Sequence, residues 1–232
     1  MSIEAYIKIG YKNSIQLLKE CDLFKNENKS RKMTFSREKI SKDFISICQK
    51  DNYKEIYDTA LKKGDYDILL KDNSFFQFTY SKEAEKVMEI RYSYYNVPFI
   101  AESYENFLKS NNFDYNEVGE NFLEEYDQYI SEADLKRQVI PIRYDYDSIR
   151  HDPVVHSSSH MHLGHNNEVR IPCDKILCPD TFIAFVIRHV YFKYYKNIIK
   201  EANFKKIYFN KDNINKNITT LNEEEKCDIY LC

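Results

Sequence analysis

The stretch SSHMHLGHNNEVRIPC, residues 158–173, decides the fold. It holds two short segments in which apolar and polar residues alternate, and this alternation indicates β-strands. Residues 164–167, which follow the first segment, are Gly-His-Asn-Asn. Glycine and asparagine readily adopt the positive φ angles of tight turns. We therefore expect an antiparallel hairpin formed by strands 158–163 and 169–173.

Alternation also fixes which side chains of this hairpin share a face, because neighbouring residues of a strand point to opposite sides. His160 and His162 point one way, and the apolar Met161 points the other. In the second strand Glu168 and Arg170 lie opposite the apolar residues. Packing the apolar faces into the core therefore places the two histidines and Arg170 together on a polar face.

The strand expected before the hairpin, residues 138–146, follows the same rule. We expect its core-facing side chains to be Ile140, Ile142, Tyr144 and Tyr146. Arg143 and Asp145 then face the other way. If this strand lies beside the hairpin, Arg143, Asp145, His160, His162 and Arg170 share one surface.

This surface supports several interpretations. His160, His162 and a carboxylate, Asp145 or Asp152, would suit a divalent metal ion. Alternatively, the histidines act as acid and base on a phosphodiester while the arginines hold the phosphate. His156-Ser157-Ser158 resembles the histidine-x-serine element of the two-histidine phosphoesterases, although only one such element is evident. The remaining interpretations are a ligand pocket without turnover and a polar sheet face exposed to water.

The rest of the chain predicts helices around a mainly antiparallel sheet, the α+β class. Helical spacing indicates helices behind Ser2, near Ser36 and from Tyr53 to Gly64, so the N-terminal region is helical. The expected strands and helices that follow are strands 67–70, 75–80 and 86–95, helices 102–109, 116–131 and 179–202, and edge strands 206–209 and 228–231. We expect a single domain, 1–232, with a helical N-terminal subdomain, 1–64, and a C-terminal core, 136–232, that carries the histidine-rich hairpin.

Composition narrows the class of protein. The chain has 232 residues, only 4 glycines and 5 prolines, and a net charge of −3, which disfavours glycine-rich phosphate loops and dedicated duplex binding. Residues 1–8 show no export signal, and the longest apolar run, 181–190, contains Arg188 and His189. Six scattered cysteines are typical of reduced thiols, so we expect a cytoplasmic protein without a membrane span.

Two other patterns in the sequence, one of cysteines and one of charged residues, are weaker indications of a functional site. Cys173 and Cys178, and Cys227 and Cys232, have the order of two zinc half-sites, but buried free thiols are the better interpretation. Asp67 with Glu89-Ile90-Arg91 is similar to the restriction-type nuclease pattern, yet that pattern has lysine where Arg91 stands. We therefore interpret these residues as surface charge.

From Arg143 to Tyr195, the run RYDYD…HSSSHMHLG…VRIPC…CPDTFIAFVIRHVYFKYY resembles the bacterial domain of unknown function 2290 family. The resemblance implies a bacterial cytosolic protein, and some members are encoded beside a helicase in antiviral defence loci. It assigns no catalytic residues.

We therefore hypothesise an antiviral-defence effector that cleaves phosphodiesters, as a nuclease or a nucleotide-processing enzyme. His156, His160, His162, Asp145, Arg143 and Arg170 are its expected catalytic residues, and Asp145, His160 and His162 are the ligands of any divalent metal ion. The alternative is a non-catalytic subunit or sensor that docks on a helicase, with the tyrosine-rich strands and acidic helices as its contact surface. The sequence leaves the substrate, the ion and the oligomeric state open.

Overall fold

The computed structural model describes residues 2–31, 35–84, 86–165, 169–200, 205, 219–227 and 230–231. Its centre is one seven-stranded sheet in which each strand pairs antiparallel with the next along the chain. The strands are β1 (Phe24–Glu27), β2 (Ile68–Leu70), β3 (Phe75–Glu83), β4 (Lys86–Tyr95), β5 (Ile142–Asp147), β6 (Ser159–Leu163) and β7 (Val169–Pro172). The predicted α+β class with a mainly antiparallel sheet is confirmed.

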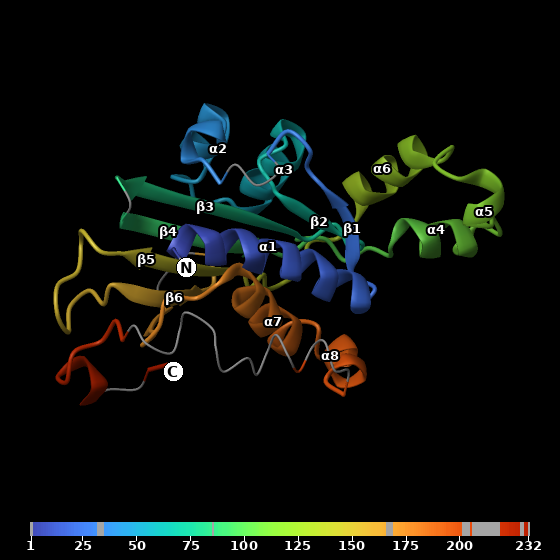
Figure 1. Ribbon diagram of the computed structural model, residues 1–232. Coiled ribbons are helices and arrows are strands. Elements are labelled where there is room, and N and C mark those ends of the chain that lie inside the picture. Colours follow the sequence, from blue (N-terminus) through green and yellow to red (C-terminus); the bar gives the residue numbers. More distant parts are fainter. Residues whose placement is uncertain are drawn as a thin grey trace.

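Helices cover both faces of this sheet (Figure 1). They are α1 (Ile3–Glu20), α2 (Lys42–Ile47), α3 (Tyr53–Lys63), α4 (Tyr104–Ser110), α5 (Tyr115–Val118), α6 (Leu123–Glu132), α7 (Pro179–His189) and α8 (Phe192–Ile198), with short 3-10 turns η1 (Arg37–Lys39) and η3 (Glu225–Cys227). Helices α1 and α7 lie on one side of the sheet and α2 and α3 on the other, while α4, α5 and α6 form an arm that extends beyond it (Figure 1). No helix in the described part of the chain is both long and apolar enough to cross a bilayer.

The face beneath α1 and α7 holds the main hydrophobic core. Aromatic side chains run across it from strand to strand, with Phe78, Tyr92 and Tyr144 buried in succession. Helix α1 approaches α7 closely at Gly10, where an added Cβ would lie 2.9 Å from Cδ of Pro179. A glycine is required there because any side chain would separate the two helices.

The opposite face is divided between two kinds of packing. At one end α2 and α3 bury a second apolar cluster that includes Phe44, Tyr57 and Phe75. At the other end the same face carries polar side chains of β3 to β7. The boundary between the two lies at Cys48 and Tyr95, which line both of the cavities found on this face.

Local signals located several helices correctly. Ser2 accepts a hydrogen bond from the backbone N–H of Ala5 and begins α1, and Gly64, with φ 70°, ends α3. Other boundaries were wrong. The helix predicted over 116–131 is broken by Gly119, whose φ is 56°, and the helix predicted over 179–202 ends at His189 before α8 begins.

Three strand predictions also need correction. The strand expected from residue 138 begins at Ile142, and Ile140, predicted to face the core, is 54% exposed. Pro141 precedes the strand and has no N–H to donate to a ladder. The short strand β1 was not predicted. Of the expected edge strands, 206–209 lies outside the described residues, and of 228–231 only Leu231 is seen paired, with Cys173.

Candidate functional site

Strand register brings the polar residues of four strands into two adjacent rows. In one row Arg91 of β4 pairs with Asp145 of β5, and Asp145 pairs with His160 of β6. In the next row Arg143 of β5 pairs with His162 of β6, which pairs with Arg170 of β7. The predicted sharing of one sheet face by Arg143, Asp145, His160, His162 and Arg170 is confirmed. Residues 166–168, which include Glu168 and half of the expected turn, lie outside the described residues.

The two histidines of this face are shielded from bulk water, whereas Arg170 is exposed. His160 is 2% exposed and His162 is 1% exposed. Side chains of η1 and α2, among them Arg37 and Phe44, line the cavity above them. The interpretation of this face as a polar surface exposed to water therefore does not fit the two histidines, because residues of η1 and α2 lie over this end of the sheet.

The cavity has a volume of about 390 Å³ and a lining rich in guanidinium groups. Its arginines are Arg37, Arg91, Arg143, Arg150 and Arg170, and its carboxylates are Glu89, Asp145 and Asp147. Three histidines, His156, His160 and His162, also line it. The excess of cations makes the cavity a place where an anion would be held.

Asp145 is the centre of the site. Its Oδ1 accepts a hydrogen bond from Nε of Arg91 at 2.9 Å, and its Oδ2 accepts one from Nε of Arg143 at 2.9 Å. Nε2 of His162 lies 3.5 Å from Oδ2. Burial acts to raise the pKa of the Asp145 carboxyl, but the approach of His162 and the two guanidinium charges outweigh it and hold the pKa well below its usual value. Asp145 is therefore a carboxylate at neutral pH.

The histidine rings are in contact with one another along the strand. The His160 ring lies between those of His156 and His162, with centroids 5.0 Å and 4.8 Å away and nearly perpendicular planes. Nδ1 of His160 lies 2.9 Å from the carbonyl oxygen of Ser157. Burial lowers the pKa of His160 to about 4, against the opposing effects of this hydrogen bond and of Asp145. The ring is neutral at pH 7.

Within the described residues, one group of side chains has the spacing to hold a metal ion, namely Asp145, His160 and His162, whose ligand atoms all lie within 4.8 Å of one another. Asp152, the alternative carboxylate, is not in this group, and its backbone bridges to His156 instead. Cys173 and Cys178 are buried free thiols, as expected, Cys227 is free, and Cys232 lies outside the described residues.

Sequence reasoning missed one principal member of the site. Arg91, interpreted as surface charge with Asp67 and Glu89, lines the cavity and pairs with Asp145. Asp67 is not at the surface either, because it is 1% exposed and pairs with the equally buried Arg31 at 3.2 Å. The signal for Arg91 was present in the alternation of β4, but only the pairing of β4 with β5 places it beside Asp145.

A comparison with models of protein families identifies the family of this chain. The model described as "Uncharacterized conserved protein (DUF2290)" matches residues 17–230. The chain belongs to the domain of unknown function 2290 family. The resemblance seen in the sequence from Arg143 to Tyr195 is thus confirmed and extends over nearly the whole chain. No curated protein and no solved structure matches it.

Proposed function

We propose that this member of the family is a cytoplasmic enzyme that cleaves a phosphate ester, either a phosphodiester of nucleic acid or a nucleotide. The observation that carries the proposal is the pairing, in one cavity, of arginines with buried histidines around an ionised carboxylate. Guanidinium groups bind phosphate oxygens in a bidentate manner, and neutral imidazoles transfer protons near neutral pH.

The residues have distinct roles in this proposal. Arg170 is exposed and forms no ion pair within the described residues. Arg37 lies 3.8 Å from Glu89 and Arg150 lies 3.6 Å from Asp147, so Arg170 is the arginine most available to a phosphate. Arg91 and Arg143 are held by Asp145 and present their remaining N–H groups to the cavity. His156 supplies a group that accepts or donates a proton, and His160 and His162 do so where they hold no ion.

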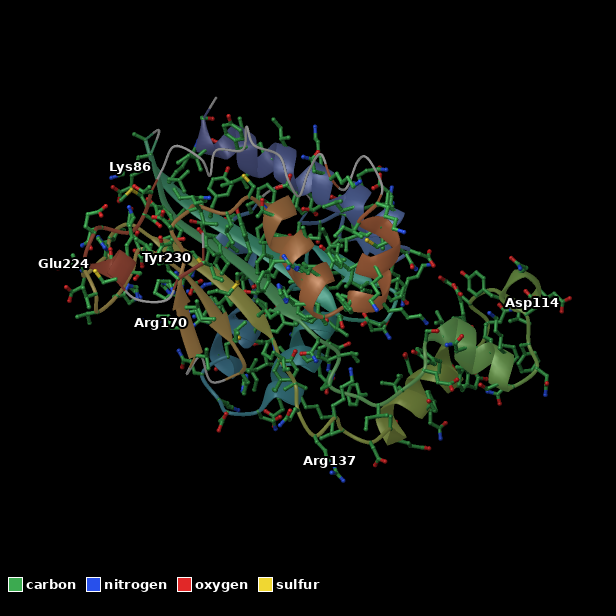
Figure 2. All side chains as sticks on the ribbon, turned by 90° about the horizontal axis from the view of Figure 1, so that it is seen from below. Lys86, Asp114, Arg137, Arg170, Glu224 and Tyr230 are labelled. Atoms are coloured by element: carbon green, nitrogen blue, oxygen red, sulfur yellow. The ribbon has the colours of Figure 1, made fainter. Side chains whose placement is uncertain are left out.

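The proposal is tested by measuring cleavage of single-stranded DNA, duplex DNA, RNA and nucleoside triphosphates by the purified chain. Once a substrate is found, Arg170→Ala should raise KM about tenfold or more, because a hydrogen bond to a charged group contributes about 1.5–3 kcal/mol. Arg137→Ala is the matched control, since Arg137 is exposed and lies far from Arg170 (Figure 2). Equal KM values for the two variants would refute the role of Arg170, and cleavage of none of the four substrates would refute the enzyme.

A second candidate function is docking on a helicase, which the resemblance to defence-locus members of the family implies. The arm of α4, α5 and α6 favours it, because the arm extends beyond the sheet to its tip at Asp114 (Figure 2) and its own aromatic rings pack together. Its exposed acidic residues are Glu105, Asp114, Glu117, Glu120, Glu124, Glu125, Asp127 and Glu132. A basic partner surface would complement them.

This second candidate makes a different prediction about variants. If the chain docks on a helicase, reversing the charge of Glu124 and Glu125 should abolish that binding and protection against phage, while His160→Ala with His162→Ala leaves both intact. The enzyme hypothesis predicts that the histidine variant, correctly folded, loses protection. The two hypotheses are therefore separated by one plaque assay.

A further inference from the structure

Three side chains of the cavity lining can each offer one ligand atom, a carboxylate oxygen or an imidazole lone pair, to a single cation. The ligand atoms belong to Asp145, His160 and His162, and the three residues are all buried.

His160 presents such a lone pair because its tautomer is fixed. The carbonyl oxygen of Ser157 can only accept a hydrogen bond, so the Nδ1 atom 2.9 Å away carries the proton. In the neutral ring Nε2 is then an acceptor, and it lies 4.0 Å from Oδ2 of Asp145. A backbone carbonyl that orients a ring in this way is the usual second partner of a histidine that binds a metal ion.

The burial of His162 is a second observation that indicates a bound ligand, and it does not depend on the tautomer of His160. Both of its ring nitrogens are buried, and neither has a hydrogen-bond partner in the part of the chain that the structure describes. An unpartnered buried polar atom costs about 1–3 kcal/mol, so its presence needs an explanation. A bound ligand at Nε2, beside the Asp145 carboxylate, provides one.

The distances fit a small ion. Ligand atoms about 2.0–2.2 Å from a tetrahedral ion lie roughly 3.3–3.6 Å apart. Nε2 of His162 is already 3.5 Å from Oδ2 of Asp145, and Nε2 of His160 is 4.0 Å from the same atom. All three ligand atoms lie within 4.8 Å of one another, so binding an ion draws the His160 and His162 rings together, toward a carboxylate that Arg91 and Arg143 keep ionised.

The geometry points to a site for one divalent ion of the zinc or cobalt type, held by Asp145 and the Nε2 atoms of His160 and His162. Two imidazoles and one carboxylate favour such ions over Mg²⁺ and Ca²⁺, which prefer oxygen ligands. Three protein ligands leave a position open toward the cavity, as in catalytic sites. The role of the ion, polarising the phosphoryl group, rests on the proposed function, whereas its binding does not depend on a substrate.

The test is titration of the EDTA-treated full chain with Co²⁺, followed by calorimetry and visible absorption. We expect one Co²⁺ per chain and an affinity at least tenfold lower in His162→Ala and in His160→Ala. His165→Ala is the matched control, because His165 also lies near an acidic residue, Asp51, but is outside the group of three. Its affinity for Co²⁺ should equal that of the parent.

A second measurement does not depend on whether the variants fold. In NMR spectra of the histidine ring nitrogens of the parent chain, Zn²⁺ should shift Nε2 of His160 and His162 and leave His151 and His165 unchanged. No binding of Co²⁺ to the parent, or equal binding by the His162→Ala variant, would overturn the inference. If no ion binds but a phosphate ester is still cleaved in EDTA, the metal site fails while the proposed function stands. If the ion binds and no ester is cleaved, the reverse holds.

Discussion

Replacing His162 with leucine is expected to stabilise the metal-free protein. The imidazole of His162 is 1% exposed, and neither of its nitrogens is hydrogen-bonded within the described residues. Leucine has a similar volume and no polar atom, so the substitution removes a desolvation cost of about 1–3 kcal/mol. We expect this gain to exceed the loss of the 3.5 Å approach of Nε2 to Asp145, because Arg91 and Arg143 still hold that carboxylate. For a chain of 232 residues, with an unfolding entropy near 2.1 cal/mol/K per residue, this corresponds to a rise in Tm of about 2–6 °C.

Replacing His160 with leucine should have the opposite effect on stability. Nδ1 of His160 donates to the carbonyl of Ser157, which is itself 6% exposed, so leucine leaves that carbonyl without a partner. We expect His160→Leu to lower the free energy of unfolding by about 1 kcal/mol or more. Urea unfolding in EDTA at pH 7.5, followed by circular dichroism, measures both. A His162→Leu variant less stable than the parent by 1 kcal/mol would show that the ring stabilises the fold, and the interpretation of His162 as a ligand would be wrong.

Three further predictions concern the fold around the site. Tyr144→Phe should lower the free energy of unfolding by about 1–2 kcal/mol, because the buried hydroxyl of Tyr144 accepts a hydrogen bond from a backbone N–H. Tyr92→Phe should lower it by less than about 0.5 kcal/mol, since the hydroxyl of Tyr92 is buried without a hydrogen-bond partner in the described chain. Equal losses of unfolding free energy in urea would contradict this prediction. Gly10→Ala should lower stability by about 1–3 kcal/mol through the contact with Pro179, and a Tm equal to that of the parent would show that α1 and α7 can separate freely. Burial raises the pKa of Asp67 from 3.8 to about 6, so the folded protein holds this proton more tightly than the unfolded chain does. The contribution of Asp67 to stability should therefore fall by about 3 kcal/mol as pH rises from about 4 to about 6. The difference in unfolding free energy between the parent and Asp67→Asn measures this change, and a difference independent of pH would refute the shift.

Local patterns were sufficient to predict much of this structure. Period-two alternation identified β3, β4, β6 and β7, and it correctly placed His160, His162 and Arg170 on one face. Caps and glycines identified the ends of α1 and α3. These features are decided by neighbours within a few residues, so a single sequence contains them.

The features that escaped prediction depend on contacts distant in sequence. Arg91 meets Asp145 only because β4 pairs with β5 across the intervening arm, which no local period indicates. The burial of the histidines depends on η1 and α2, which come from a part of the chain more than a hundred residues earlier. Strand β1, with the sequence FKNE, has one large apolar residue and is a strand because β2 pairs with it.

The initial rate of phosphate-ester cleavage by the parent chain and by the His160→Ala, His162→Ala double variant tests the central claim most directly. Because positioned acid and base groups contribute about 10²–10⁴-fold, we predict that the double variant retains the circular dichroism spectrum of the parent and loses at least about a hundredfold in kcat. A folded double variant that cleaves at the rate of the parent would contradict the account.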